Sequence, residues 1–267
     1  MSNLTDAELR ALAYYAIGVT SEGKDVAYKL SFCGNATTGP NGDTQLRPIG
    51  NSGYSIGEMQ TDLGARSDKA HELVKSFQAW AQVEHPDWVL SEFQASQAGI
   101  GLGRDGRHIR DPDYDAHNQD YRRTHPGRDI PSSQLPTAGS DIDPILKERL
   151  NKYLASEAGK SFVHALDVKQ VEILFERVAV PLQKTAIYQQ SSPEDQAKLF
   201  GIVAKAYNQG PAYAKRILSD LKADRIDSLA DVDKRILAFP DFMRTGREHA
   251  LDGVAVFNAL RSASANN

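Results

Sequence analysis

The sequence predicts a mostly α-helical protein of the α+β class, with one small β-hairpin or sheet near its N-terminus. Apolar residues recur at spacings of three and four over most of the 267-residue chain, a pattern typical of amphipathic helices. Only residues 24–60 depart from it early in the chain, because they combine alternating apolar and polar side chains with glycine-rich turns. Hydrophobic residues make up 40% of the chain and charged residues 25%, so a sizeable core can form.

The first helix is signalled at both ends. Thr5 and Glu8 form the pattern of a capping box, and apolar residues then fall on one face of the predicted helix. Gly18 and Gly23 bracket its expected end, since glycine is common where helices terminate. Glu22 is therefore expected in the last turn of this helix or just beyond it.

The β element is expected in the stretch that follows. Residues 26–32 alternate apolar and polar side chains, which predicts a half-buried strand. Residues 34–42 are rich in Gly, Asn, Thr and Pro and are expected to form a loop. Residues 54–59 then supply the returning strand, so residues 1–66 comprise one helix and a small hairpin.

Helices account for most of the remaining chain. Residues 67–80 and 88–95 have helical periodicity, whereas residues 99–139 hold many Gly, Pro, Asp, Arg and His residues and few aliphatic ones. We expect a long irregular insertion there. Later helices are expected over residues 143–157, from a cap at Asp167 and Gln170, from Ser192 to Tyr207, and over 212–221, 229–238 and 247–260.

The predicted organisation is one domain spanning residues 1–267. It consists of the N-terminal helix and hairpin (1–66), the insertion (99–139) and a helical lobe (140–267). The insertion is the one candidate boundary that the sequence offers.

Composition excludes several classes of protein. A net charge of −4 argues against general binding to nucleic acids. No apolar run reaches the length of a membrane span. The first residues lack a basic region followed by an apolar one, so we expect no secretory signal peptide. The single cysteine, Cys33, cannot build an intrachain disulfide framework and suits synthesis in a reducing compartment.

Residues 108–125 contain the side chains that most suggest a metal. Asp111, Asp113 and Asp115 alternate in a way that could hold Ca²⁺, but Ala116 and Arg122 occupy positions where a calcium loop carries Gly and Glu. A solvated acidic loop is the favoured interpretation. The nearby histidines fit no compact zinc pattern; they are His108, His117 and His125. We predict no metal and no cofactor.

Two sets of motifs carry a resemblance to known enzymes. The first is Ser21-Glu22-Gly23 with Tyr28, followed by Gly53-Tyr54-Ser55-Ile56-Gly57. The second is Gly57-Glu58-Met59-Gln60, followed by Ala206-Tyr207-Asn208-Gln209-Gly210-Pro211. The first set resembles phage-type lysozymes and the second resembles soluble lytic transglycosylases. Both belong to the lysozyme-like superfamily, in which a helix-borne Glu faces a small sheet beside a helical lobe. The resemblance covers the first 65 residues and the segment around 200–220.

The resemblance assigns the chemistry to the N-terminal motifs. Glu22 would be the general acid, with a pKa raised by burial so that it can protonate a glycosidic oxygen. Ser55 would position the attacking water. Phage-type lysozymes carry an Asp shortly before that position, where this chain has Ile, Gly and Asn at 49–51. The nearest carboxylates are Asp43 upstream, our candidate, and Asp62 beyond the hairpin.

The resemblance also implies which residues bind the glycan. Tyr54, Gln60, Tyr207 and Asn208 would line the cleft. Tyr207 and Asn208 also precede Gly210 in a pattern that ends a helix on its own chemistry, so a purely structural role stays open.

The function implied is that of a peptidoglycan muramidase that cuts the β-1,4 bond between N-acetylmuramic acid and N-acetylglucosamine. A lytic transglycosylase remains an alternative, because there the 6-hydroxyl of the sugar attacks and no second carboxylate is needed. A chitinase- or chitosanase-like glycosidase is another alternative. A helical binding or structural module without chemistry is the alternative from a different class.

Delivery follows from the expected absence of an export signal. Peptidoglycan lies outside the cytoplasm, so the resemblance implies a phage lysin released by a holin or a bacterial effector delivered by a secretion system. The expected partners are peptidoglycan and, for an effector, an immunity or inhibitor protein. No nucleic-acid partner and no membrane span are expected.

Overall fold

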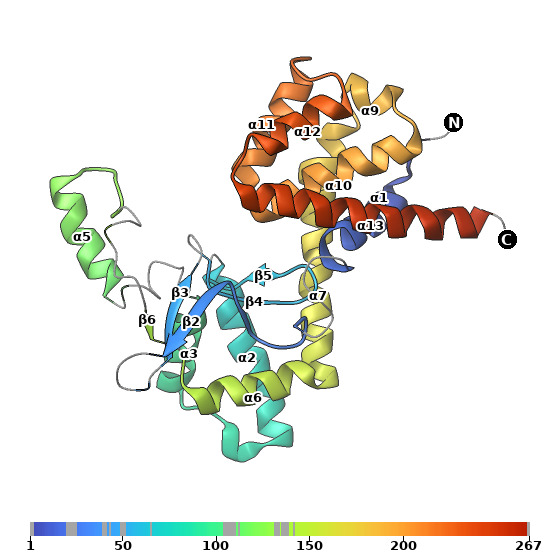
Figure 1. Cartoon of the computed structure of the whole chain (residues 1–267). Helices are drawn as coiled ribbons and strands as arrows, with labels where there is room; N and C mark the ends of the chain where they lie inside the picture. Colours follow the sequence, from blue (N-terminus) through green and yellow to red (C-terminus); the bar gives the residue numbers. More distant parts are fainter. Residues whose placement is uncertain are drawn as a thin grey trace. The chain divides into compact units, whose positions relative to one another are not determined.

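The computed structural model describes residues 3–19, 26–38, 42, 44–48, 52–64, 66–103, 111, 113–130, 134, 139–140 and 142–265. These residues are mostly helical and include two small antiparallel sheets (Figure 1). The chain divides into two compact units, which we call the helical unit (Met1–Lys24 with Asp167–Asn267) and the sheet-bearing unit (Asp25–Leu166). Residues 99–139 were the one candidate boundary in the sequence. They lie wholly within the sheet-bearing unit, so this segment does not separate the two units.

The helical unit is built around one central helix. Its elements are α1 (Asp6–Tyr14), the π-helical turn η1 (Tyr15–Val19), the end of α7 (Glu157–Leu174), the π-helical turn η4 (Phe175–Ala179), α8 (Val180–Leu182), α9 (Ala186–Gln190), α10 (Pro193–Gln209), α11 (Pro211–Lys222), α12 (Leu229–Leu237) and α13 (Asp241–Ala265). Every residue of α10 from Gln196 to Ala206 except the half-buried Lys198 is buried, and α1, η1, η4, α11, α12 and α13 contact this helix. The expected helices near 193–207, 212–221, 229–238 and 247–260 are confirmed, the last of them longer than predicted.

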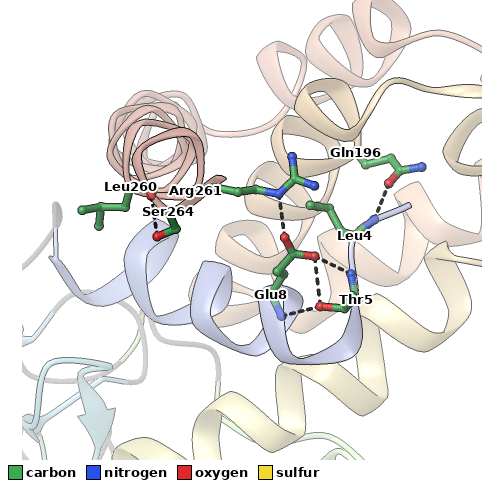
Figure 2. A network of polar contacts seen from close by, with 7 residues as sticks. All are labelled: Leu4, Thr5, Glu8, Gln196, Leu260, Arg261 and Ser264. Atoms are coloured by element: carbon green, nitrogen blue, oxygen red, sulfur yellow. Dashed lines mark hydrogen bonds and ion pairs between the residues drawn. The ribbon is translucent and has the colours of Figure 1, made fainter. Parts of the chain in front are cut away.

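The predicted capping box at the start of α1 is confirmed. The Thr5 hydroxyl accepts a hydrogen bond from the Glu8 amide at 3.2 Å, and the Glu8 carboxylate accepts one from the Thr5 amide at 2.7 Å. Figure 2 shows two further ties: Arg261 of α13 donates to Glu8 at 2.6 Å, and the Leu4 amide donates to Gln196 of α10 at 3.0 Å. Burial works to raise the pKa of Glu8, but hydrogen bonds from Arg261 and Thr5 outweigh it and lower this pKa.

The sheet-bearing unit contains two three-stranded sheets and several helices. One sheet has the order β1 (Ser31–Phe32), β4 (Tyr54–Ile56), β5 (Thr61–Asp62), and the other has the order β2 (Gly34–Thr38), β3 (Thr44–Pro48), β6 (Gly139–Ser140). The helices are α2 (Ser67–Glu84), η2 (Pro86–Trp88), α3 (Glu92–Gly103), α5 (Tyr114–Thr124), α6 (Pro144–Ala155) and the first part of α7. The core lies between sheet residues and helices, and includes Tyr54, Leu73, Phe77, Leu150 and Tyr153.

The strands differ from the predicted ones. Residues 26–28 form a turn, and only Ser31–Phe32 of the first predicted strand is extended. The predicted loop 34–42 begins instead with β2, which pairs with β3 along its whole length. The returning strand ends at Ile56, because Gly57 (φ 85°) and Gln60 (φ 51°) form a turn in the left-handed region.

The predicted irregular insertion at 99–139 is wrong in part. Its first residues complete α3, and α5 occupies Tyr114–Thr124. The buried Asp111 supports the start of α5, since its carboxylate accepts a hydrogen bond from the Asp113 amide at 3.1 Å. Asn118 then holds the chain beyond the helix by accepting from the Ile130 amide at 2.8 Å. These side-chain hydrogen bonds support both ends of α5, a helix that apolar periodicity alone does not predict.

None of the helices in the described part of the chain has the length and apolar character needed to cross a membrane.

Candidate functional site

Two of the predicted catalytic residues, Glu22 and Asp43, lie outside the described residues. The helix expected before Glu22 is present: α1 continues into the π-helical turn η1, which ends at Val19. Isolated π-helical turns are rare and occur frequently at functional sites. Such a turn therefore stands three positions before the predicted acid.

Two glycines hold η1 against its neighbours in the helical unit. A Cβ at Gly253 of α13 would collide with the backbone carbonyl oxygen of Tyr15. A Cβ at Gly201 of α10 would lie 2.6 Å from Val254 Cγ2 and 3.4 Å from Ala16 Cβ. Real Cβ contacts with backbone are not this short, so glycine at 253 is required for the close approach of α13 and η1, whereas the short contact at Gly201 is with a side chain of α13. The backbone that leads toward Glu22 is thereby anchored at η1.

Ser55 lies in the centre of the β1–β4–β5 sheet and shares one face with two polar residues. Its direct cross-strand partners are Ser31 of β1 and Asp62 of β5. Directly opposed residues in antiparallel strands have Cβ atoms about 4.5–5.5 Å apart and project from the same face. Asp62 also accepts a hydrogen bond from the Gly53 amide at 3.3 Å. The sheet thus places a carboxylate beside the serine that the resemblance assigns to the attacking water.

Tyr54 projects from the opposite face of this sheet into the core. It is 1% exposed, its ring makes an edge contact with Phe32 at 5.5 Å between centroids, and Lys147 Nζ lies 5.1 Å from its ring centre. A side chain this enclosed has no surface for a polysaccharide. Tyr54 therefore holds the sheet against the helices, which differs from its predicted role in lining a cleft.

Gln60 is a turn residue. It is half-buried, and its side-chain nitrogen donates to the Gly57 carbonyl at 2.9 Å, which closes the turn between β4 and β5. This turn sets the register that brings Ser55 opposite Asp62. The structure therefore gives Gln60 a role in shaping the Ser55–Asp62 pair.

Tyr207 and Asn208 occupy the last turn of α10, and both are half-buried. The Asn208 side-chain oxygen accepts a hydrogen bond from Gln170 Nε2 of α7 at 2.9 Å. One turn earlier on the same two helices stand two buried charged residues, Asp167 and Lys205. Buried charged and polar groups are costly in a helical core and are often kept for function. The motif residue Asn208 thus has a polar contact with the buried Gln170, and each of the two helices also buries a charged residue three positions earlier.

Gly210 follows the last residue of α10, and side-chain crowding favours glycine at this position. Its backbone is extended (φ −169°), so left-handed geometry does not explain the glycine. A Cβ there would lie 2.8 Å from Tyr213 Cδ2 and 3.0 Å from Met243 Cε. Pro211 then opens α11 at its first position, where a missing amide proton costs nothing.

The predicted site residues therefore fall into two groups. Ser55 and Gln60 belong to the sheet-bearing unit, where the structure adds Asp62 as the direct partner of Ser55. Tyr207 and Asn208 belong to the helical unit, where the structure adds Gln170. The sequence predicts a helix start at Asp167 and Gln170. Both residues instead lie inside α7, which begins ten residues earlier, at Glu157.

The acidic segment weighed as a calcium loop is organised around one carboxylate. Asp111 Oδ2 lies 2.6 Å from His117 Nδ1, and Asp111 Oδ1 accepts from the Asp113 amide. The hydrogen bond with Asp111 raises the pKa of His117. In the described ranges, no three His, Cys, Asp or Glu side chains are grouped in a way that could hold a metal ion.

Comparison with protein-family models, with curated proteins and with solved structures finds no match to this chain. The resemblance to the lysozyme-like superfamily therefore rests on its motifs alone.

Proposed function

We propose that this protein cleaves peptidoglycan glycan strands as a muramidase, with Glu22 as the general acid. The observation that carries the proposal is the direct pairing of Ser55 with Asp62 on one face of a small sheet. A glycosidase needs an acid to protonate the leaving oxygen and, for inverting hydrolysis, a carboxylate that activates water. The motif around Glu22 supplies the first, and the Ser55–Asp62 pair supplies the second.

Asp62 replaces Asp43 as our candidate for the second carboxylate. A carboxylate can accept a proton from a water molecule beside it. The Ser55 hydroxyl beside it can both donate and accept a hydrogen bond, so it can fix the orientation of that water. Hydrolysis is therefore favoured over the transglycosylase alternative, which requires no base next to the serine.

The remaining motif residues have binding roles in this proposal. Asn208 contacts the sugar through its amide, and Tyr207 stands beside it at the end of α10. Gln60 shapes the turn that sets the Ser55–Asp62 register. The substrate lies outside the cytoplasm, so we further propose release as a phage lysin or delivery as an antibacterial effector that is paired with an immunity protein.

The proposal is tested by the loss of turbidity of chloroform-permeabilised Gram-negative cells. The wild-type protein is expected to clear them, and Glu22→Gln is expected to lose this activity, because the amide cannot donate a proton to the leaving oxygen. Glu84→Gln is the matched control, since Glu84 is exposed at the end of α2. Equal clearing by the Glu22 variant removes Glu22 from the mechanism, and inactivity of the wild type favours a helical binding module.

The chitinase-like alternative is separated by substrate. Chitin oligomers and purified peptidoglycan are offered to the wild-type protein, and the new reducing ends are counted. Cleavage of chitin oligomers without cleavage of peptidoglycan would contradict the muramidase proposal and support a chitinase-like activity.

A further inference from the structure

Three aromatic side chains form a cluster on the surface of the helical unit, which we call the aromatic platform; it consists of Tyr213, Phe239 and Phe242. The Tyr213 ring of α11 lies 4.8 Å from Phe239 and 6.2 Å from Phe242, measured between ring centroids. Tyr213 and Phe239 are half-buried, and Phe242 at the start of α13 is 46% exposed. Apolar side chains that are grouped on a surface, rather than scattered singly, mark binding sites.

The platform is joined to the motif that ends α10. The Tyr213 amide donates to the Gly210 carbonyl at 2.9 Å, and a Cβ at Gly210 would lie 2.8 Å from Tyr213 Cδ2. Gln209 Nε2 donates to the backbone carbonyl of Phe242 at 3.3 Å. Gly210 follows Asn208 by two positions, and two residues span at most about 7 Å. The rings therefore stand beside the segment at which the proposed function places a sugar.

The rings are inclined to one another, and this leaves ring surface for a ligand. The interplanar angle is 53° between Tyr213 and Phe239 and 76° between Tyr213 and Phe242. Rings at such angles cover less of each other's faces than parallel rings do. Arg235 lies 5.8 Å from the centre of the Phe239 ring, so Phe242 is the more open member of the platform.

This chemistry suits a sugar ring. The faces of a pyranose carry C–H groups and are apolar, whereas its hydroxyl groups project from the edge. An aromatic side chain can therefore bury the apolar face of a sugar while the hydroxyl groups stay in water.

A cation lies on the same side of α11 as Tyr213. Arg216 follows Tyr213 by three positions, a spacing that places two side chains on one face of a helix. Arg216 is exposed, and no carboxylate pairs with it among the residues that the structure describes. Peptidoglycan carries carboxylates on the substituents of its muramic acid, so this charge is complementary to peptidoglycan.

We propose that the aromatic platform is a further subsite that binds a pyranose unit of the glycan strand, next to the sugar held at the end of α10. This inference rests on the proposed function for its choice of ligand, and it adds a binding site outside the motifs that carry the resemblance. Contact at such a subsite tightens the binding of a long strand without lowering the barrier to bond cleavage.

Substitutions at Phe242 separate the flat ring from its apolar character. Phe242→Leu keeps an apolar side chain and removes the ring, whereas Phe242→Tyr keeps the ring. Phe239→Leu tests a second member of the platform. Phe93→Leu is the matched control, because Phe93 is a 73% exposed phenylalanine of the sheet-bearing unit. All variants are made in the Glu22→Gln parent, so that the polymer stays intact while binding is measured.

The measurement is the Kd for two polymers, with melting temperatures in parallel. Insoluble purified peptidoglycan is used in co-sedimentation, and end-labelled glycan strands stripped of their peptides are used in fluorescence anisotropy. An aromatic contact corresponds to about a 3- to 10-fold effect, so we expect Phe242→Leu to raise the Kd for both polymers by about that factor. Phe242→Tyr and Phe93→Leu should stay within about twofold of the parent.

The outcomes separate the two proposals. If the wild type cleaves peptidoglycan and the folded Phe242→Leu variant binds both polymers as its parent does, the inference is overturned while the proposed function stands. Weaker binding to intact peptidoglycan alone also overturns it, because the ring would then contact the peptides. A parent that binds neither polymer overturns it as well.

Two further results remain decisive. If the wild type releases no reducing ends, yet Phe242→Leu weakens binding to both polymers, the proposed function fails and the platform stands as a glycan-binding site. If Phe242→Leu does not fold, Phe239→Leu decides by the same change in Kd.

Discussion

Ser55 of β4 and Asp62 of β5 are direct cross-strand partners, and this places a carboxylate beside the serine of the Gly-Tyr-Ser-Ile-Gly motif. The four-residue turn from Gly57 to Gln60 sets this register. The pairing is the basis for assigning hydrolysis to the proposed site.

The role of Asp62 is tested by Asp62→Asn. The amide can still accept from the Gly53 backbone, as Asp62 Oδ1 does, but it cannot take a proton from water. We expect kcat for release of reducing ends to fall by about 100-fold or more, with little change in melting temperature. Ser31→Ala, on the other side of Ser55, is the control and should retain activity. Full activity in the Asp62 variant would return the second carboxylate to Asp43.

The close packing of η1 is tested by Gly253→Ala. Alanine normally stabilises a helix interior by about 1 kcal/mol relative to glycine, but a methyl group here meets the Tyr15 backbone carbonyl, which cannot move aside cheaply. We expect a net loss of about 1–2 kcal/mol in the free energy of unfolding, measured by urea titration.

Gly246→Ala on the same helix is the control for that prediction. Its methyl group would meet the flexible side-chain amide of Gln209, which can move. This variant should be close to neutral or slightly stabilised. Equal effects of the two substitutions would show that the close contact with the η1 backbone does not account for the glycine at position 253.

The start of α1 should be stabilised more by its cap than by its ion pair. Thr5→Ala removes the hydroxyl that accepts from the Glu8 amide and should cost about 1 kcal/mol of unfolding free energy. Arg261→Met breaks the partly exposed pair with Glu8 and should cost about 0.5 kcal/mol or less. Both values come from urea unfolding curves. The reverse order would mean that the ion pair with Arg261 stabilises the start of α1 more than the cap does.

The pair formed by Asp111 and His117 should make α5 sensitive to pH. Because the pKa of His117 is raised in the folded chain, the pair stabilises α5 fully below the ordinary histidine value of about 6.5. This contribution is lost as pH rises through the higher, folded-state value. An NMR titration of the His117 ring should therefore give a pKa above that of a free histidine. In Asp111→Asn it should return to the ordinary range, and an unchanged value would contradict the pairing.

The helices were predictable because their signals are local. The 229–238 prediction matches α12 closely, since Ser228 caps the helix and apolar positions follow at helical spacing. The strands were less predictable, because β2 is a polar Gly-Asn-Ala-Thr-Thr segment that becomes extended only through pairing with β3. Asp167 and Gln170 have the spacing of a helix start, yet both lie within α7. Local sequence signals do not fix the helix boundary where tertiary contacts also contribute.

The site was predictable in its motifs and less so in its partners. A four-residue turn after Ile56 implies the pairing of Ser55 with Asp62, so counting the hairpin register could have chosen Asp62 over Asp43. No spacing in the sequence predicts the contact between Gln170 and Asn208, which are 38 positions apart. Burial of Tyr54 likewise depends on which face of the sheet meets the helices.

The most direct test of glycan cleavage by Glu22 is mass spectrometry of the soluble fragments released from purified peptidoglycan. The wild type should release muropeptides with reducing N-acetylmuramic acid ends, and Glu22→Gln at the same concentration should release none. Soluble fragments from the Glu22 variant at the wild-type rate would contradict the account, as would a wild type that leaves the peptidoglycan intact.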